Sequence, residues 1–207
     1  MSLLTGAQIL QRMDEIGELR LVITPFFDKM SQLNPGSASV DLRLGCRFSA
    51  AKRGSLTHVG KDQPSQQTMD EYYVPFGQEF VLHPRHFVLA TTLEWIRLPE
   101  TLGGYVIGRS SYGRMGLIIA TAVGVHPKYS GVLTLELTNL GEVPITLRPG
   151  QAICQLFLHE VRPVGGESTD RSAFVGSLFP RLGSVDEDAI EAFLNKLDGR
   201  TGSEGKV

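Results

Sequence analysis

The spacing of hydrophobic residues changes near residue 37 and divides the chain into a helical start and a β-rich remainder. Ile9, Leu10 and Met13 recur at intervals of three and four after Thr5, a residue that can cap a helix. Residues 19–26, LRLVITPF, alternate enough to predict a strand. From Ser37 onward come short β-type runs separated by Gly, Pro and Asn: 39–48, 71–76, 79–84, 86–99, 103–108, 116–123, 131–139, 143–147 and 152–161. This pattern predicts an all-β barrel or sandwich with short flanking helices.

Two polar stretches interrupt or follow the β-type runs. Residues 50–70 are weakly patterned, so we expect a long surface loop within one β domain. After Val161 the chain is rich in Gly and Ser, and residues 185–200 then predict a second short helix before a frayed tail. We therefore expect a β domain at 1–160, including the N-terminal helix, and a C-terminal arm or lid with a short helix at 161–207.

Composition and charge narrow the possible functions. The chain has 207 residues, a hydrophobic fraction of 42% and a net charge of −2, so no global attraction to nucleic acid or anionic membranes is expected. No apolar run approaches the roughly 18 residues of a membrane helix. Cys46 and Cys154 form no CxxC pair and are too few for a disulfide framework. We expect a soluble, cytoplasmic protein without a catalytic cysteine.

Residues 108–117, GRSSYGRMGL, combine two arginines, two serines and three glycines between two apolar runs. Glycines let a ligand approach the backbone, and Arg109 and Arg114 can supply charge-assisted hydrogen bonds to an anion. Ser110 and Ser111 add hydroxyl groups. Phosphate is the natural guest of such a turn, although the same residues could form a solvated turn with paired arginines.

Glu136 lies within the hydrophobic run GVLTLELTN at 131–139. In a strand, Thr134 and Glu136 share one face, whereas Leu133, Leu135 and Leu137 share the other. Burial raises the pKa of a carboxyl group toward neutrality, and a buried carboxylate needs a partner. Glu136 is therefore either a general acid/base or half of an ion pair.

The histidines do not indicate a metal site. His126 precedes a proline in a turn that would place its ring beside Tyr129, and a lone histidine of this kind is usually a surface or hydrogen-bonded residue. The other histidines show no metal-ligand spacing with Cys, Asp or Glu: His58, His83, His86 and His159. The chain also lacks the HxE and downstream PCxxC of the zinc deaminases, so no zinc is expected.

Several ordered blocks between Leu4 and Glu160 resemble the dCTP deaminase family, the homotrimeric all-β relatives of trimeric dUTPase. The blocks are SASVDLRLG (37–45), FVLHPRHFVLATTLE (80–94), GRSSYGR (108–114), TAxxVxPxYxG (121–131), TLELTN (134–139) and LRPGQAICQL (147–156). The resemblance implies a distorted β-barrel or jelly roll of the dUTPase type. It also implies a homotrimer whose active sites are shared between subunits and closed by the C-terminal arm.

The resemblance implies a metal-free deamination that converts dCTP and water into dUTP and ammonia. Glu136 would take a proton from a water held by Ser110, and the resulting hydroxide would attack C4 of cytosine. The protonated carboxyl would then deliver protons to N3 and to the departing ammonia. Backbone at Ala122 would lie near the attacked carbon, and Mg²⁺ would enter only as the counter-ion of the triphosphate. The implied nucleotide-binding residues are Arg109, Ser110, Ser111, Arg114, His126, Tyr129, Thr134, Leu135 and Phe174.

Three departures from the family pattern leave the substrate open. His126 stands where the family has an aspartate that contacts the sugar, and Val123-Gly124 replaces a His-Arg pair. In the arm, residues 172–177 keep Phe174 but lack the family's lysine and glutamine. Sugar preference, dUTPase activity and closure of the arm are therefore unsettled. A family member acting on another pyrimidine nucleotide and a non-catalytic nucleotide-binding or regulatory homologue are alternative hypotheses.

Overall fold

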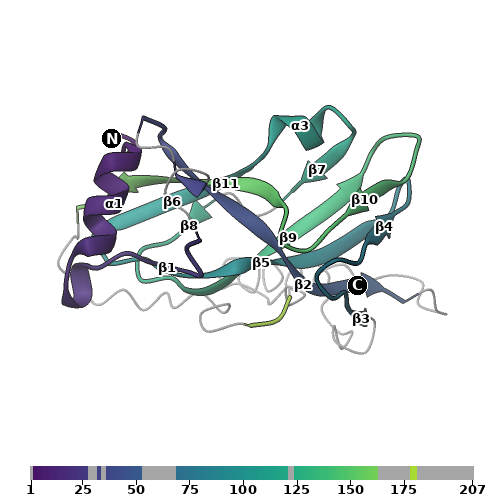
Figure 1. Cartoon of the computed structure of the whole chain (residues 1–207), viewed down its shortest axis with the longest axis horizontal. Helices are drawn as coiled ribbons and strands as arrows, with labels where there is room; N and C mark the ends of the chain where they lie inside the picture. The colour runs from purple at the N-terminus through teal and green to yellow at the C-terminus, as the bar shows by residue number, and fades with distance from the viewer. Residues whose placement is uncertain are drawn as a thin grey trace, which may run out of the picture. The chain divides into compact units, whose positions relative to one another are not determined.

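The structure is a computed structural model that describes residues 2–27, 32–33, 36–52, 69–120, 124–162 and 178–180 (Figure 1). One compact unit, Met1–Lys52 with Met69–Arg181, contains all of them. The elements are α1 (Gly6–Asp14), the 3₁₀ turn η1 (Gly17–Leu19), β1 (Val22–Thr24), β2 (Ser39–Ala51), β3 (Met69–Tyr73), β4 (Phe80–Leu82), β5 (Phe87–Arg97), β6 (Leu102–Gly108), α3 (Ser110–Gly113), β7 (Leu117–Ile119), β8 (Gly124–Val125), β9 (Ser130–Asn139), β10 (Ile145–Leu147) and β11 (Ala152–Glu160).

The opening helix begins as the sequence predicts. Thr5 Oγ1 accepts the Gln8 N–H at 3.4 Å, and Gln8 Oε1 accepts the Thr5 N–H at 2.9 Å, which completes a capping box. Ile9 is buried, and Leu10 and Met13 pack against the core. The amphipathic face of α1 therefore fastens the N-terminus to the sheet.

The strands form one curled, nine-stranded antiparallel sheet and a small two-stranded sheet of β10 and β4. The order in the large sheet is β7-β9-β5-β2-β11-β6-β8, with β1 added to β5 and β3 to β2. Strand β2 belongs to both halves, because Ser39–Arg43 pair with β11 and Leu44–Ala50 pair with β5. The predicted class, all-β of the distorted barrel type with short helices, is confirmed.

The core lies inside the curl of the sheet and follows the alternation of the strands. On β9, Leu133, Leu135 and Leu137 are buried, while Thr134 and Glu136 are half-buried on the other face, as predicted. The core also takes buried side chains from β2, β5, β6 and β11, among them Leu42, Leu44, Phe48, Ile96, Leu102, Leu156 and Leu158.

Parts of the sequence prediction fall outside the described residues. These parts are residues 53–68 of the surface loop predicted at 50–70 and nearly all of the arm, including the second helix at 185–200 and Phe174. The ends of that predicted loop are strand instead, because Ala50 and Ala51 of β2 pair with Asp70 and Met69 of β3. The division into a β domain at 1–160 and an arm at 161–207 stays a prediction. Cys46 and Cys154 are free thiols, and burial raises the pKa of Cys154. Within the described ranges, no helix is long and apolar enough to cross a membrane.

Candidate active site

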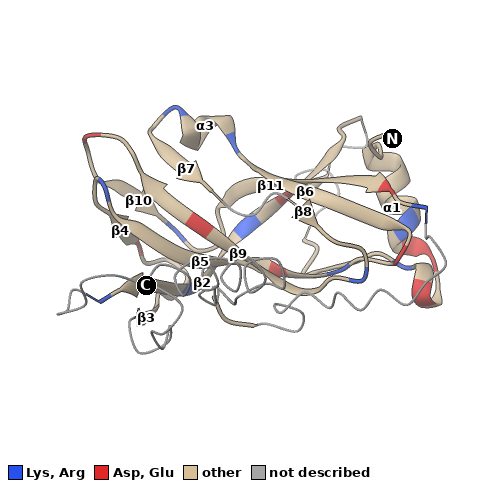
Figure 2. Cartoon of the chain, turned by 180° about the vertical axis from the view of Figure 1, so that it is seen from behind, with Lys and Arg blue, Asp and Glu red and all other residues tan. Residues whose placement is uncertain are grey.

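The arginine-serine turn folds into the short helix α3 between β6 and β7. Arg109 precedes α3, and its carbonyl accepts the N–H groups of Tyr112 and Gly113 at 3.0 and 3.2 Å, while Arg114 N–H bonds to Ser110 O. Ser110, Ser111 and Arg114 are exposed. Because several backbone N–H groups bond within the turn, contacts to an anion would come mainly from these side chains and Arg109. Figure 2 shows basic positions at both ends of α3.

Arg109 is held in place by two residues of the sheet. Its Nη1 donates to Asp41 Oδ2 at 2.5 Å, and Gln155 Nε2 donates to Asp41 Oδ1 at 2.9 Å. Gln155 on β11 lies directly opposite Asp41 on β2. The carboxylate side chain is only 16% exposed, which strengthens its interaction with the guanidinium. The sequence prediction did not include Asp41 or Gln155, although each is a polar residue within a β-type run, as Glu136 is.

A further arginine lies near the same turn. The Tyr112 ring packs against the core, and burial raises the pKa of its hydroxyl, whereas the charges of Arg109 and Arg148 act in the opposite direction. Arg148 is exposed and its Nε donates to Glu79 at 2.7 Å. Both arginines near Tyr112 are thus paired with a carboxylate, Arg109 with Asp41 and Arg148 with Glu79.

Strand β7 connects the turn to the Glu136 strand. A side chain at Gly108 would contact Ile119 at 3.3 Å, and Ile119 pairs with Leu137 on β9. Ala120 N–H then donates to the carbonyl of Glu136 at 2.8 Å. The phosphate-binding candidates and the candidate acid/base thus flank the same short strand. Ala122, two positions after Ala120 in the sequence, lies outside the described residues.

The remaining candidates on the described part of the chain differ in exposure. His126 is exposed and follows β8, which lies at the opposite end of the strand order from β7. Tyr129 is buried, its hydroxyl donates to Val132 O at 2.7 Å, and burial raises its pKa to about 12. Leu135 is fully buried in the core, and Thr134 lies on the face of Glu136. Within one chain, α3 and the Glu136 strand flank β7, whereas His126 follows β8 on a different part of the strand order.

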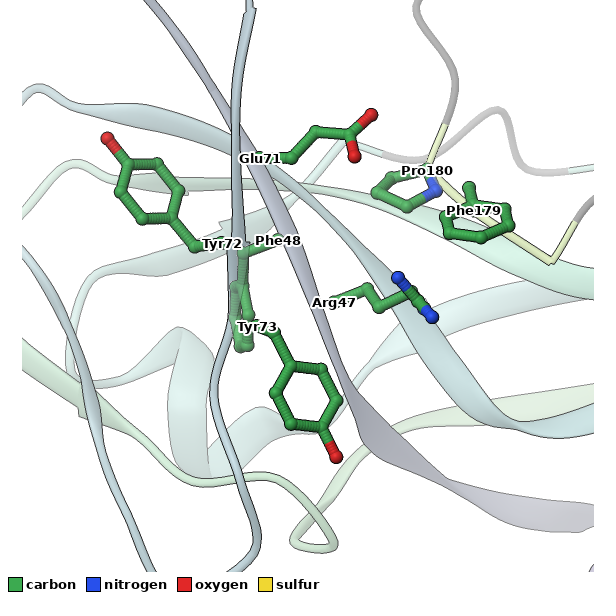
Figure 3. Close-up of a pocket in the computed structure, with 7 residues that line it drawn as sticks. All are labelled: Arg47, Phe48, Glu71, Tyr72, Tyr73, Phe179 and Pro180. Atoms are coloured by element: carbon green, nitrogen blue, oxygen red, sulfur yellow. The ribbon is translucent and has the colours of Figure 1, made fainter.

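A small cavity of about 190 Å³ lies elsewhere, on β2 and β3 (Figure 3). Its lining is Arg47, Phe48, Glu71, Tyr72, Tyr73, Phe179 and Pro180, which includes none of the predicted site residues. The Arg47 guanidinium lies 4.1 Å from the centre of the Phe179 ring. Among the described residues, no cluster of three His, Cys, Asp or Glu side chains is placed to hold a metal ion.

The curled antiparallel sheet and the arginine-serine turn beside a strand carboxylate define an all-β protein of the dUTPase-like class. A family model described as dCTP deaminase-like matches residues 3–161, and the chain belongs to that family. It is 40% identical over 194 residues to a dCTP deaminase of Natronomonas pharaonis, covering 90% of this chain and 96% of that one. It is 42% identical over 146 residues to a dUMP-forming dCTP deaminase of Dictyoglomus thermophilum, covering 70% of this chain and 74% of that one.

A solved structure agrees with the fold. The 2′-deoxycytidine 5′-triphosphate deaminase from Agrobacterium tumefaciens superimposes with a TM-score of 0.57 at 21% identity, covering 75% of this chain and 46% of that one. The family resemblance drawn from the sequence blocks is confirmed.

Proposed function

We propose that this chain catalyses the hydrolytic deamination of dCTP, releasing ammonia. One observation carries the proposal: a turn bearing two arginines and two serines is connected through β7 to a half-buried strand glutamate, in a chain of this family. The names of the relatives favour dCTP over another pyrimidine nucleotide, and they favour an enzyme over a non-catalytic homologue.

The triphosphate would be bound by Arg109, Ser110, Ser111 and Arg114. Asp41 holds one nitrogen of Arg109, which leaves the other donors of the planar guanidinium for phosphate oxygens. A side chain that is oriented before binding loses less conformational freedom when the ligand arrives. Magnesium would enter with the triphosphate as its counter-ion.

The chemistry would require no zinc. Glu136 would accept a proton from a water placed by Ser110, and the hydroxide oxygen would bond to C4 of cytosine. The protonated carboxyl would give this proton to N3, then take the proton of the new C4 hydroxyl and pass it to the amino group, so that the C4 carbonyl forms, the C4–N bond breaks and ammonia leaves. The sum is dCTP plus water giving dUTP plus ammonia. The hydrogen bond from Ala120 N–H to the Glu136 carbonyl holds Ala120, two positions before Ala122 in the sequence, beside the backbone of Glu136.

A second product is a specific alternative, because the Dictyoglomus relative is named as dUMP-forming. That reaction would add a second hydrolysis, which splits dUTP into dUMP and pyrophosphate. In the dUTPases an aspartate activates the second water, and the corresponding position here is His126. This substitution favours dUTP as the product of the present chain.

We also propose that the active unit is a homotrimer with shared sites, located in the cytoplasm. Tyr105 and Phe157 stack at 5.7 Å on β6 and β11, and Ile107 beside them is 47% exposed, which is an apolar surface suited to a second copy. Free thiols at Cys46 and Cys154 suit a reducing compartment.

Product analysis tests the proposal. Purified protein with Mg²⁺ is incubated separately with dCTP, CTP, dCMP, dUTP and dTTP, and ammonia, pyrophosphate and nucleotides are measured. We expect ammonia and dUTP from dCTP, no pyrophosphate, and little reaction with the other nucleotides. Ammonia release from another nucleotide but not from dCTP would contradict the substrate, and dUMP with pyrophosphate would establish the alternative product.

A further inference from the structure

Glu94 is a fully buried carboxylate for which the proposed chemistry has no use. Its side chain on β5 is 0% exposed, and burial raises its pKa to about 7. Oε2 accepts the backbone N–H of Arg43 at 2.8 Å, and Oε1 accepts a hydrogen bond from Gln32 Nε2 at 2.9 Å. A carboxylate in such a place is costly unless every partner is well placed, so its contacts are informative.

The first contact lies where β2 passes from one half of the sheet to the other. Arg43 is the last residue of β2 that pairs with β11, and Leu44 is the first that pairs with β5. The pairing with β5 is irregular between Leu44 and Phe48. Glu94 thus provides the acceptor for a backbone N–H at the crossing of β2, the strand that runs diagonally through Figure 1.

A second interaction, made by the side chain of Thr92, lies on the other side of β5. The pairing of β5 with β9 is interrupted between Thr91 and Trp95. There, Thr92 Oγ1 accepts the Leu133 N–H at 3.0 Å and donates to the carbonyl of Glu94 at 2.9 Å. Where the regular backbone pairing of β5 is interrupted, the side chain of Glu94 therefore bonds to β2, and the side chain of Thr92 bonds to β9.

These interactions join the strands that carry the two halves of the site. Asp41, which holds Arg109, lies on β2 two positions before Arg43, and Glu136 lies on β9 three positions after Leu133. We propose that Glu94 is a positioning residue that, together with Thr92, fixes the Asp41–Arg109 half of the site relative to Glu136. This inference rests on the proposed function, because it takes Glu136 as the acid/base.

Substitutions at Glu94 separate positioning from folding. Glu94→Met keeps the approximate volume and removes the acceptor for Arg43, whereas Glu94→Gln keeps a carbonyl oxygen for it. In the full-length enzyme we expect kcat for dCTP to fall at least tenfold in Glu94→Met and to return to within about threefold of wild type in Glu94→Gln. Inorganic triphosphate would contact only the Asp41–Arg109 half of the site. Its dissociation constant should therefore change less than twofold in both variants.

Ile96→Val is the matched control, because Ile96 is fully buried two positions further along β5. It should lower the melting temperature and leave kcat within twofold. If Glu94→Met does not fold, Thr92→Val removes the link to Leu133 and is expected to show the same loss of kcat with unchanged triphosphate binding. A kcat within twofold of wild type in the folded Glu94→Met or Thr92→Val protein would overturn the inference.

A structural measurement separates this inference from the proposed reaction. In crystal structures of wild type and the folded variant, the Cα–Cα distance between Arg109 and Glu136 should differ, whereas it should be unchanged in Ile96→Val. An unchanged distance would overturn the positioning role whatever the wild-type enzyme catalyses. Absence of ammonia release by the wild type would contradict the proposed function alone.

Discussion

Asp41 shows how one carboxylate can prepare a cationic site for an anion. It occupies one edge of the Arg109 guanidinium, and Gln155 in turn fixes the carboxylate. The arginine therefore keeps its charge and its direction before a triphosphate arrives. Its contribution to binding then depends on a residue that need not touch the ligand.

Asp41→Asn is expected to raise KM for dCTP about tenfold, roughly 1.4 kcal/mol, with kcat reduced less than threefold. The amide removes the charge-assisted bond that orients Arg109. Steady-state kinetics check this expectation, with Asp14→Asn, a position at the end of α1, as the control. An unchanged KM in Asp41→Asn would show that Arg109 needs no such support.

Glu94 should make the stability of the protein depend on pH. Its pKa is raised from 4.5 to about 7 in the folded state, so the fold binds this proton more tightly than the unfolded chain does. The resulting stabilisation is fully present below pH 4.5 and is lost as the pH rises through about 7. By the usual conversion the loss is roughly 3 kcal/mol.

Urea unfolding of wild type and Glu94→Gln at pH 5 and pH 8 measures this effect, because the other titrating groups are common to both proteins. The free energy of unfolding of wild type minus that of the variant should be smaller at pH 8 than at pH 5. An equal difference at both pH values would mean that Glu94 titrates normally.

Single positions on one strand were predictable, but partners across strands were not. The alternation in GVLTLELTN correctly put Glu136 on the face opposite three leucines. Asp41, Gln155 and Glu94 meet their partners only through strand pairing, and those partners are up to 114 positions apart along the chain. The local pattern contains no information about such register.

The turn between β6 and β7 depends on its glycines for different reasons. Gly116 has φ +93°, and an added Cβ would lie 2.7 Å from Gly141 N. At Gly113, within α3, an added Cβ would meet open space, and the backbone there is not left-handed. Only Gly116 is therefore required by the backbone path that returns the chain to β7.

Gly116→Ala is expected to destabilise the protein by at least about 1 kcal/mol and to raise KM for dCTP, because the turn must shift. Gly113→Ala should be neutral or stabilising by up to about 1 kcal/mol, since alanine favours helix. Thermal unfolding and kinetics compare the pair. Equal effects of the two substitutions would contradict the specific role of Gly116.

Element type was easier to predict than element length. The capping residue and apolar spacing identified α1, and most β-type runs became strands. The expected strand at 19–26 is only Val22–Thr24, because η1 occupies its start and Pro25 has no N–H for a ladder. The run at 108–117 contains α3, since its serines, tyrosine and glycines lack the alternation that a strand needs.

The proposed trimer makes an apolar patch on β6 and β11 necessary for activity. Ile107→Glu places a charge beside the Tyr105–Phe157 stack, and desolvating that charge would oppose association. We expect Ile107→Glu to give a smaller species by light scattering and to lose most of its activity while remaining folded. Val81→Glu is the control, because Val81 on β4 has a similar exposure of 46%.

A wild-type mass equal to one chain, with full activity, would contradict the shared site. An Ile107→Glu protein that is monomeric and fully active would also contradict the shared site. The family blocks predicted this assembly, and it stays a prediction that these two measurements test.

The most direct measurement is ammonia release from dCTP by Glu136→Gln, compared with Glu142→Gln at an exposed loop position. Glutamine has nearly the same shape as glutamate but cannot accept the proton from water. We expect kcat to fall at least about 100-fold in Glu136→Gln, with dCTP affinity within about threefold, and to be unchanged in Glu142→Gln. Ammonia release by Glu136→Gln at the wild-type rate would contradict the role of Glu136 as the acid/base.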